Sequence, residues 1–349
     1  MNSKTRFYNL AVCLCLIGAA AFAPGCKKDE STEPTAFSHK PKLIMGTETE
    51  LTAVALNSKQ ADAAKALLAA ERALRNVEVK MSSWLDASEL SLFNQAIAGQ
   101  PAKLSETTLG LLRLSKQLAK QTDGAFDATC LPILQLWRDA RKNKRLPTTL
   151  QIARAVSQCG WDKIELGADS ATKKIDDASV DLGGIAKGFG IDQAAEALQA
   201  GGMLGGMVNV GGDVRCFGQR VGGGKWRIGV KNPFNSKELF AIVEIPSGSV
   251  CTSGNYERFF EIDSKRYSHI VDPRTGQPVD LAPSVTVFAP TATSADAWAT
   301  ALSVLGEAGL ELIDESSGLE AMLIIGGPED YRLVMTPGFK KLLAEPPAK

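Results

Sequence analysis

The chain has 349 residues, with 39 Lys and Arg balanced by 39 Asp and Glu, so its formal net charge is zero. This balance, and the lack of a basic stripe with interleaved aromatic residues, argue against a nucleic-acid-binding surface. At 44% hydrophobic residues, the chain can form one large domain or two lobes that share a site.

The first 25 residues have the pattern of an export signal. Lys4 and Arg6 precede an apolar run over Leu10–Phe22. The run is shorter than the roughly 20 residues that cross a bilayer, and small residues follow it, as in cleaved signals. Ala23-Pro-Gly-Cys26 resembles the lipobox of bacterial lipoproteins, in which the cysteine is lipidated. We therefore expect a lipoprotein signal peptide over 1–25 and lipidation of Cys26, with plain secretion as the alternative.

A polar segment that contains Pro34 follows this cysteine. Its composition predicts a flexible, lipid-anchored tether over residues 26–42, and we expect one folded domain over 43–345. The protein would then be exported and anchored on the periplasmic side of the inner or the outer membrane. Lys27, where an aspartate would favour the inner membrane, slightly favours the outer one.

Hydrophobic periodicity and turn residues predict the elements of the folded part. In chain order they are a strand over Leu43–Leu56, helices over Ala61–Val79, Ser88–Ala98, Ser105–Gln121, Gln135–Lys144 and Thr148–Gln158, a hairpin within Lys163–Ile175, a strand from Val180, a helix over Ile185–Gln199, an antiparallel sheet between Gly206 and Phe288, helices over Ala295–Leu305 and Leu310–Glu315, and strands over Ala321–Ile325 and Tyr331–Met335. Helices and strands are partly segregated, which predicts an α+β fold.

Four cysteines lie in this part, at Cys130, Cys159, Cys216 and Cys251. None has CxxC spacing, which argues against a zinc site. In an oxidising compartment they can form disulfides, with three possible pairings. The alternative is that they are small buried hydrophobic residues.

The segment Asp181-Leu-Gly-Gly-Ile-Ala-Lys-Gly188 predicts a phosphate site. Two glycines enter a predicted helix whose first turn carries Lys187. A cation opposes the positive end of the helix dipole unless a polyanion binds there, between backbone N–H groups and the lysine. The segment matches neither GxxxxGK[ST] nor GxGxxG, and a glycine turn before an ordinary helix is the alternative.

Asp296 and Thr300 lie four residues apart in a predicted helix capped by Thr293 or Ser294, so both oxygens share one face. A carboxylate and a hydroxyl suit a hard cation such as Mg²⁺, which keeps waters and phosphates as further ligands. The alternatives are local: an acid in the first turn offsets the helix dipole, and a threonine can bond the carbonyl four residues earlier.

His269 is the only histidine in residues 43–345, where a strand runs into a proline and glycine turn. It can move a proton near neutral pH or be a structural histidine. The glycine pair in Asn209-Val-Gly-Gly-Asp213 marks a close backbone approach or a bulge. Trp84 and Phe126 follow turn residues, so their rings can stack on a flat heterocycle, or pack in the core.

Each of these signals is weak, but their order is distinctive. The segments are Met45-Gly-Thr47, Met81-Ser-Ser-Trp84, Ser88-Glu-Leu-Ser-Leu-Phe-Asn94, Gly124-Ala-Phe-Asp127, Asp181–Gly188, Asn209–Asp213, Thr252-Ser-Gly254, Ser268–Gly276, and Asp296 with Thr300. From Leu43 to Leu305 this order resembles the ApbE family of FAD:protein FMN transferases.

The resemblance implies mixed and antiparallel sheets with packed helices, in two lobes around one FAD site. It implies a Mg²⁺-dependent enzyme that moves the FMN part of FAD to a threonine or serine hydroxyl of an acceptor flavoprotein, with release of AMP. The acceptor would be a protein with a flavinylation motif, expected to belong to a membrane redox complex.

By the same resemblance, FAD would be lined by Met45, Trp84, Ala125, Phe126, Asp127, Asp181, Lys187 and Ile270. Mg²⁺ would be held by the Gly184 carbonyl, Asp296 and Thr300. Lys187 and His269 would be catalytic, His269 as the base. Ala299 stands where some members carry a further carboxylate.

Two other functions remain open from the sequence: a Mg²⁺-dependent FAD pyrophosphatase that yields FMN and AMP, and a flavin-binding lipoprotein without catalysis. The resemblance does not imply self-modification: acceptors of this family carry a threonine or serine after Asp-Gly-Ala or Asp-Gly-Ser, whereas Asp123-Gly-Ala is followed by Phe126. All of these functions require the Asp181–Gly188 segment to meet Asp296 and Thr300 in space.

Overall fold

The computed structural model describes residues 33–235, 237–254 and 259–344. The expected signal peptide, Cys26 and the first part of the tether lie outside these ranges. Within them, no helix has both the length and the apolar character needed to cross a membrane.

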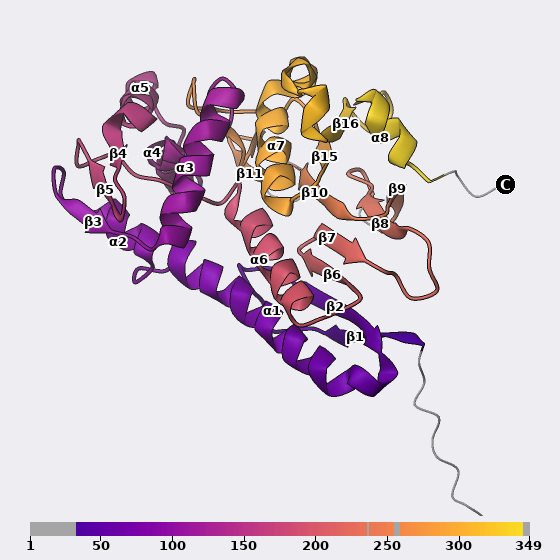
Figure 1. The fold of residues 1–349 in the computed structure, drawn as a ribbon. Helices are drawn as coiled ribbons and strands as arrows, with labels where there is room; N and C mark the ends of the chain where they lie inside the picture. The colour runs from indigo at the N-terminus through magenta and orange to yellow at the C-terminus, as the bar shows by residue number, and fades with distance from the viewer. Residues whose placement is uncertain (1–32, 236, 255–258, 345–349) are drawn as a thin grey trace, which may run out of the picture.

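The main sheet has eight strands in the order β1-β2-β6-β7-β10-β15-β16-β17 (Figure 1). They are β1 (Pro34–His39), β2 (Thr49–Leu56), β6 (Gly205–Val210), β7 (Asp213–Gly218), β10 (Gly248–Gly254), β15 (Ser284–Ala289), β16 (Glu320–Ile325) and β17 (Arg332–Met335). Every neighbouring pair is antiparallel. This sheet confirms the strand-rich region predicted from the sequence.

Both faces of this sheet are covered. Helices α1 (Gln60–Met81), α6 (Ala186–Ala200) and α7 (Ala292–Leu305) lie on one face. The hairpin of β8 (Trp226–Lys231) and β9 (Leu239–Ile245) and the short helix α8 (Pro337–Leu342) contribute to a second apolar cluster on the other face. Successive strand residues point to opposite faces, so a strand buried on both sides reads as a continuous apolar run.

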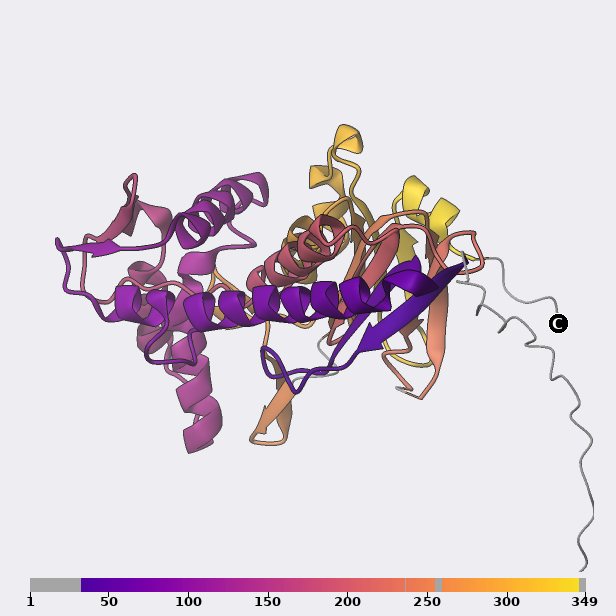
Figure 2. The same ribbon diagram turned by 60° about the horizontal axis from the view of Figure 1, so that its bottom comes forward.

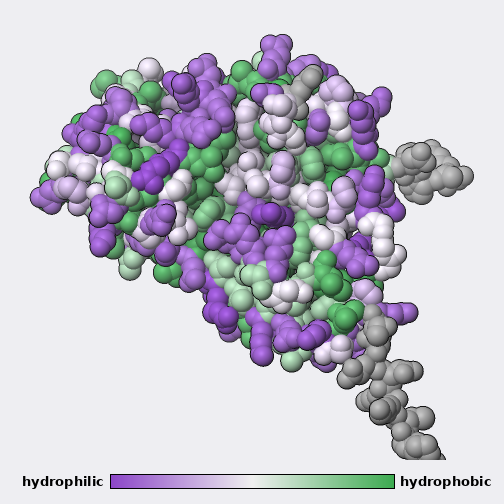
Figure 3. All heavy atoms as spheres, viewed as in Figure 1, coloured by the Kyte–Doolittle hydropathy of each residue, from purple (hydrophilic) through white to green (hydrophobic). Residues whose placement is uncertain are grey.

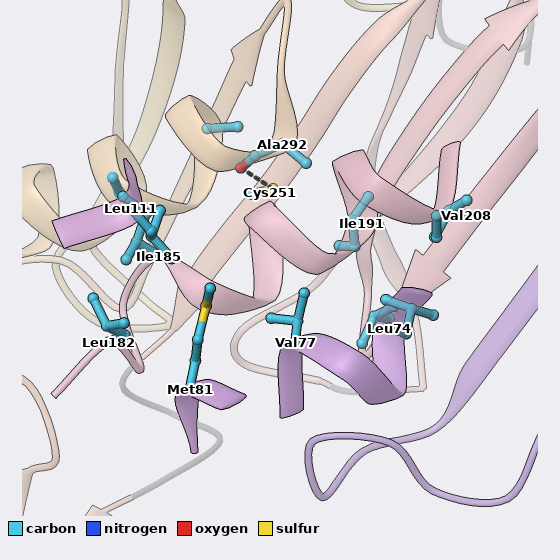
Figure 4. Close-up of a cluster of buried hydrophobic side chains, with 14 of the residues drawn as sticks. Leu74, Val77, Met81, Leu111, Leu182, Ile185, Ile191, Val208, Cys251 and Ala292 are labelled. Carbon is cyan, nitrogen blue, oxygen red and sulfur yellow. Dashed lines mark hydrogen bonds between the residues drawn. The ribbon is translucent and has the colours of Figure 1, made fainter. Parts of the chain in front are cut away.

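The core between the helices and the sheet positions α6. Leu74, Val77 and Met81 of α1 face Ile185 and Ile191 at the start of α6 (Figure 4). All five are at most 4% exposed. Burial of these five apolar side chains therefore fixes α1 and α6 against each other. At the surface, on the face seen in Figure 3, hydrophilic side chains are spread widely, with smaller apolar areas between them.

A second part of the structure carries the remaining helices, and α1 runs from it to the main sheet (Figure 2). It holds α2 (Glu89–Gln95), α3 (Glu106–Gln121), α4 (Leu131–Asn143), α5 (Thr149–Gln158), and a sheet of β3 (Pro101–Lys103), β5 (Ser170–Lys173) and β4 (Ile164–Leu166). Two hairpins, β11 (Phe259–Ile262) with β12 (Lys265–Ser268) and β13 (Val271–Asp272) with β14 (Gln277–Pro278), share an apolar cluster with α4 and α5. Helices and antiparallel strands in separate layers confirm the α+β fold.

Short 3₁₀ segments connect these elements: Asn57–Lys59, Ala128–Cys130, Trp161–Lys163, Gly306–Leu312 and Glu315–Ser317. The predicted helix over Leu310–Glu315 is wrong, because Gly306, at a φ of 63°, ends α7 and a 3₁₀ turn follows. The predicted strand over Leu43–Leu56 begins only at Thr49, after a turn closed between Ile44 and Thr47.

Two further corrections come from contacts between distant residues. Pro34–His39, expected in the tether, pairs with β2, and His39 Nε2 lies 2.6 Å from Glu71 Oε2. The folded part therefore contains His39 as well as His269. Val180, where a strand is predicted to begin, lies in no strand; the Asn94 amide exchanges 2.8 Å hydrogen bonds with its backbone N–H and carbonyl.

The four cysteines of the described residues are free thiols, and three of them are buried. Burial raises the pKa of Cys159 and Cys216 to about 12. Thiols that stay protonated at neutral pH behave as small hydrophobic residues, which agrees with the second of the two alternatives above.

Candidate active site

The glycine segment and α7 meet in the structure. The Gly188 N–H donates to Asp296 Oδ2 at 2.8 Å, and Thr300 Oγ1 donates to the Gly184 carbonyl at 3.4 Å. These pairs join residues 108 and 116 positions apart. The spatial requirement for the predicted site is therefore met.

Helices α6 and α7 cap each other. Asp296 of α7 accepts the Gly188 N–H in the first turn of α6, which has no side-chain cap of its own. Asp192 of α6 accepts the N–H groups of Ala292 and Thr293, at 2.8 and 2.9 Å, at the start of α7. Unpaired N–H groups at helix starts need such acceptors, and the negative charge suits the helix dipole. This exchange of hydrogen bonds fixes the position of α6 relative to α7.

The same contacts correct two details of the prediction. The cap of α7 is Thr291, not Thr293 or Ser294, so Asp296 lies in the second turn. At the entrance to α6, the Gly183 N–H donates to Asp181, the Ile185 and Ala186 N–H groups donate to a backbone carbonyl, and Gly188 donates to Asp296. These four N–H groups therefore have acceptors within the protein.

A cavity of about 750 Å³ opens beside these helices. Its lining includes every residue predicted for FAD, metal or catalysis: Met45, Trp84, Ala125, Phe126, Asp127, Asp181, Gly184, Lys187, His269, Ile270, Asp296 and Thr300. The volume is in the range of cofactor pockets. The lining residues come from both parts of the structure, as two lobes around one site require.

The donor set at the α6–α7 contact suits Mg²⁺. It consists of the Gly184 carbonyl, the Thr300 hydroxyl and Asp296 Oδ1, while Oδ2 of Asp296 is engaged by Gly188. No group of three or more His, Cys, Asp or Glu side chains in the described ranges can hold a metal. Mg²⁺ needs no such group, because it keeps water and phosphate oxygens as ligands.

Lys187 reaches from α6 toward two carboxylates. Its Nζ contacts Asp213 Oδ2 and lies 3.7 Å from Asp296 Oδ1. The side chain remains 30% exposed, so it is accessible from the cavity. Sequence reasoning missed the contact with Asp213, although this residue directly follows the Gly211-Gly212 turn between β6 and β7.

Asp181 organises one wall of the cavity. Its Oδ2 accepts from Ser83 Oγ at 2.7 Å and from Arg138 Nη2 at 3.2 Å, and its Oδ1 accepts from the Gly183 N–H at 2.7 Å. The Arg138 guanidinium lies 4.2 Å from the centre of the Trp84 ring. Trp84 is 74% exposed and lines the cavity, where its ring can stack on a flat ligand.

Four other predicted residues form the walls. Phe126 and Ala125 are buried, 4% and 1% exposed, and also line the cavity, so both belong to the core and to the cavity wall. Asp127 Oδ1 accepts from Thr129 N and Oγ1, each at 2.8 Å, and burial raises the pKa of its carboxyl. Met45 has a φ of 51°, held by a 2.7 Å bond from its N–H to Glu78 Oε1.

His269 and Ile270 follow β12 and line the cavity beside Phe259 and Phe260. His269 is an exposed residue of the cavity wall. Sequence reasoning missed Ser83, Glu78, Arg138 and the β11 aromatic residues. Helical periodicity places Arg138 on a polar face of α4, but it does not say which polar residue meets Asp181.

Comparison with known proteins agrees with this fold. The structure is similar to that of a flavin transferase, ApbE from Vibrio cholerae, with a TM-score of 0.79 and 30% identity over 89% of this chain and 100% of the other. This likeness defines the class as flavin transferases. The model of the ApbE family matches residues 45–323, and the chain belongs to that family.

Two curated relatives carry the name FAD:protein FMN transferase. The protein from Klebsiella pneumoniae is 31% identical over 340 residues, which is 94% of this chain and 96% of the relative. The protein from Haemophilus influenzae is 35% identical over 283 residues, which is 78% of this chain and 82% of the relative.

Proposed function

We propose that this chain is a Mg²⁺-dependent FAD:protein FMN transferase. It moves the FMN part of FAD to a threonine or serine hydroxyl of an acceptor protein and releases AMP. The observation that carries the proposal is the meeting of Gly184, Asp296 and Thr300 beside Lys187, in one cavity with the exposed Trp84 ring.

The reaction is a substitution at the phosphorus attached to riboflavin. The acceptor hydroxyl oxygen forms the new bond to this phosphorus, the bond to the AMP phosphate oxygen breaks, and the hydroxyl proton passes to a base. Mg²⁺ held by Gly184, Asp296 and Thr300 would neutralise charge on the phosphate oxygens. Lys187 adds a positive charge beside the same oxygens, and Trp84 offers a ring face to the flavin or the adenine.

Product analysis tests the transfer. The protein is incubated with FAD and Mg²⁺, with and without an acceptor flavoprotein domain, and the products are measured by mass spectrometry. We expect an acceptor heavier by one FMN, and AMP in equal amount. AMP and free FMN with an unlabelled acceptor would instead indicate a pyrophosphatase, and no AMP at all would indicate a binding protein.

We propose His269 as the base that accepts the hydroxyl proton. His269 is an exposed residue that lines the cavity directly after β12. His269→Ala is expected to lower the rate of transfer about a hundredfold, as loss of a general base does, and to remove a group from the pH profile of kcat. The measurement is the transfer rate across pH at saturating FAD; an unchanged rate and profile would exclude this role.

We also propose that the protein acts outside the cytoplasm, on an acceptor in a membrane redox complex. Residues 1–25 would direct export and Cys26 would carry the lipid on the periplasmic side. The basic residues Lys4 and Arg6, the short apolar run and the sequence before Cys26 support this location.

A further inference from the structure

Asp213 is a buried carboxylate directly behind the cavity wall. It is 2% exposed at the start of β7, and its Oδ1 accepts the Thr252 N–H of β10 at 2.9 Å. Its Oδ2 is in contact with the Lys187 ammonium, its only polar contact within the described residues. A buried carboxylate costs free energy unless it is paired, so this contact decides where the ammonium lies.

Asp213 is held by a tight and closely packed hairpin turn. Val210 and Asp213 close the β6–β7 hairpin through Gly211 and Gly212, which have φ values of 65° and 97°. Gly211 packs so closely on Thr47 that a Cβ would lie 2.5 Å from Thr47 Oγ1. The carboxylate therefore belongs to the main sheet, whereas Asp296 belongs to α7, and Lys187 bridges the two from α6.

Lys187 lies between these two carboxylates. Its Nζ contacts Asp213 but remains 3.7 Å from Asp296 Oδ1, the oxygen of the proposed metal site. A lysine side chain has a flexible four-carbon stem, and its ammonium group is attracted to the nearest carboxylate that has no other positive partner. Without the charge of Asp213, the ammonium would close on Asp296 and compete with the metal for the same oxygen.

We propose that Asp213 is a positioning residue that holds the Lys187 ammonium off Asp296, so that Asp296 Oδ1 stays open to a divalent cation. The inference rests on the metal site proposed above. Asp213 also offsets the repulsion between Lys187 and the bound cation. The sheet thus controls a site whose ligands come from the glycine segment and α7.

A double-mutant cycle on metal binding tests this inference without catalysis. Asp213→Asn keeps the acceptor for Thr252 and removes the charge, and Lys187→Met removes the competing ammonium. Mn²⁺ binding to the protein without FAD is measured from the EPR signal of the free ion, and thermal melting confirms that each variant is folded. Asp272→Asn is the matched control, because this buried carboxylate pairs with Arg274 instead.

We expect Asp213→Asn to raise the Kd for Mn²⁺ about tenfold or more, the size typical of residues that orient metal ligands. Lys187→Met should tighten binding about tenfold in the Asp213→Asn background but only about twofold in the wild type, and this difference is the coupling. Asp272→Asn should leave the Kd unchanged.

Equal effects of Lys187→Met in both backgrounds would reduce the role of Asp213 to general electrostatics and overturn the inference. An unchanged Kd in Asp213→Asn, with normal binding by the wild type, would overturn the inference alone. No saturable Mn²⁺ binding by the wild type would overturn the metal site together with it.

Discussion

Replacing Asp296 with asparagine is expected to lower the rate of FMN transfer about a thousandfold, because the proposed metal site loses its only carboxylate. The remaining donors, the Gly184 carbonyl and the Thr300 hydroxyl, carry no charge. Asparagine can still accept the Gly188 N–H, which Asp296 Oδ2 accepts at 2.8 Å. The variant should therefore keep the contact between α6 and α7 while it loses the charge.

The measurement is the initial rate of acceptor labelling at increasing Mg²⁺ concentration. Ser303→Ala is the matched control, because Ser303 is another buried polar residue of α7 and its hydroxyl bonds only the Ala299 carbonyl within the described residues. The control should retain nearly full activity. If Asp296→Asn labelled the acceptor at the wild-type rate and with the same dependence on Mg²⁺, this residue would have no part in metal binding.

The local elements of the fold could be predicted because their signals lie within a few residues of each other. The Ser105 hydroxyl accepts the Thr108 N–H and begins α3 where the sequence indicates. The hairpin of β4 and β5 lies within the predicted Lys163–Ile175 segment. Helix α1 exceeds its predicted range by only one residue at the start and two at the end.

Elements fixed by distant partners could not be predicted in the same way. Val180 finds its hydrogen bonds in the side chain of Asn94, which no strand pattern reveals. Helix α7 begins at Ala292 because Asp192, a residue of another helix, accepts its first N–H groups. Strand β1 exists because it pairs with β2, although its own composition is typical of a tether.

The candidate site shows the same division. The residues that the resemblance to a family names all line one cavity. The resemblance did not reveal how their oxygens are used: Asp181 is shared among three donors, and one oxygen of Asp127 closes a local turn. Asp213 was visible in its motif, but its pairing with Lys187 depends on the β6–β7 hairpin.

Gly188→Ala is expected to destabilise the fold by about 3 kcal/mol and to abolish metal binding by the protein that still folds. A Cβ at this position would lie 2.1 Å from the Ala292 carbonyl oxygen and 2.8 Å from Asp296 Cβ. Backbone cannot yield as a flexible side chain does, so α6 and α7 must separate. That separation breaks the bond from Gly188 to Asp296 and moves the Gly184 carbonyl away from Thr300.

Gly110→Ala provides the matched control. Gly110 also lies in a helix, α3, but a Cβ there would meet nothing within 4 Å. Alanine should therefore stabilise α3 by up to about 1 kcal/mol, through its higher helix propensity. Urea unfolding gives both free energies, and Mn²⁺ binding reports on the site. Wild-type stability and metal affinity in Gly188→Ala would show that the close approach of α6 and α7 does not assemble the metal ligands.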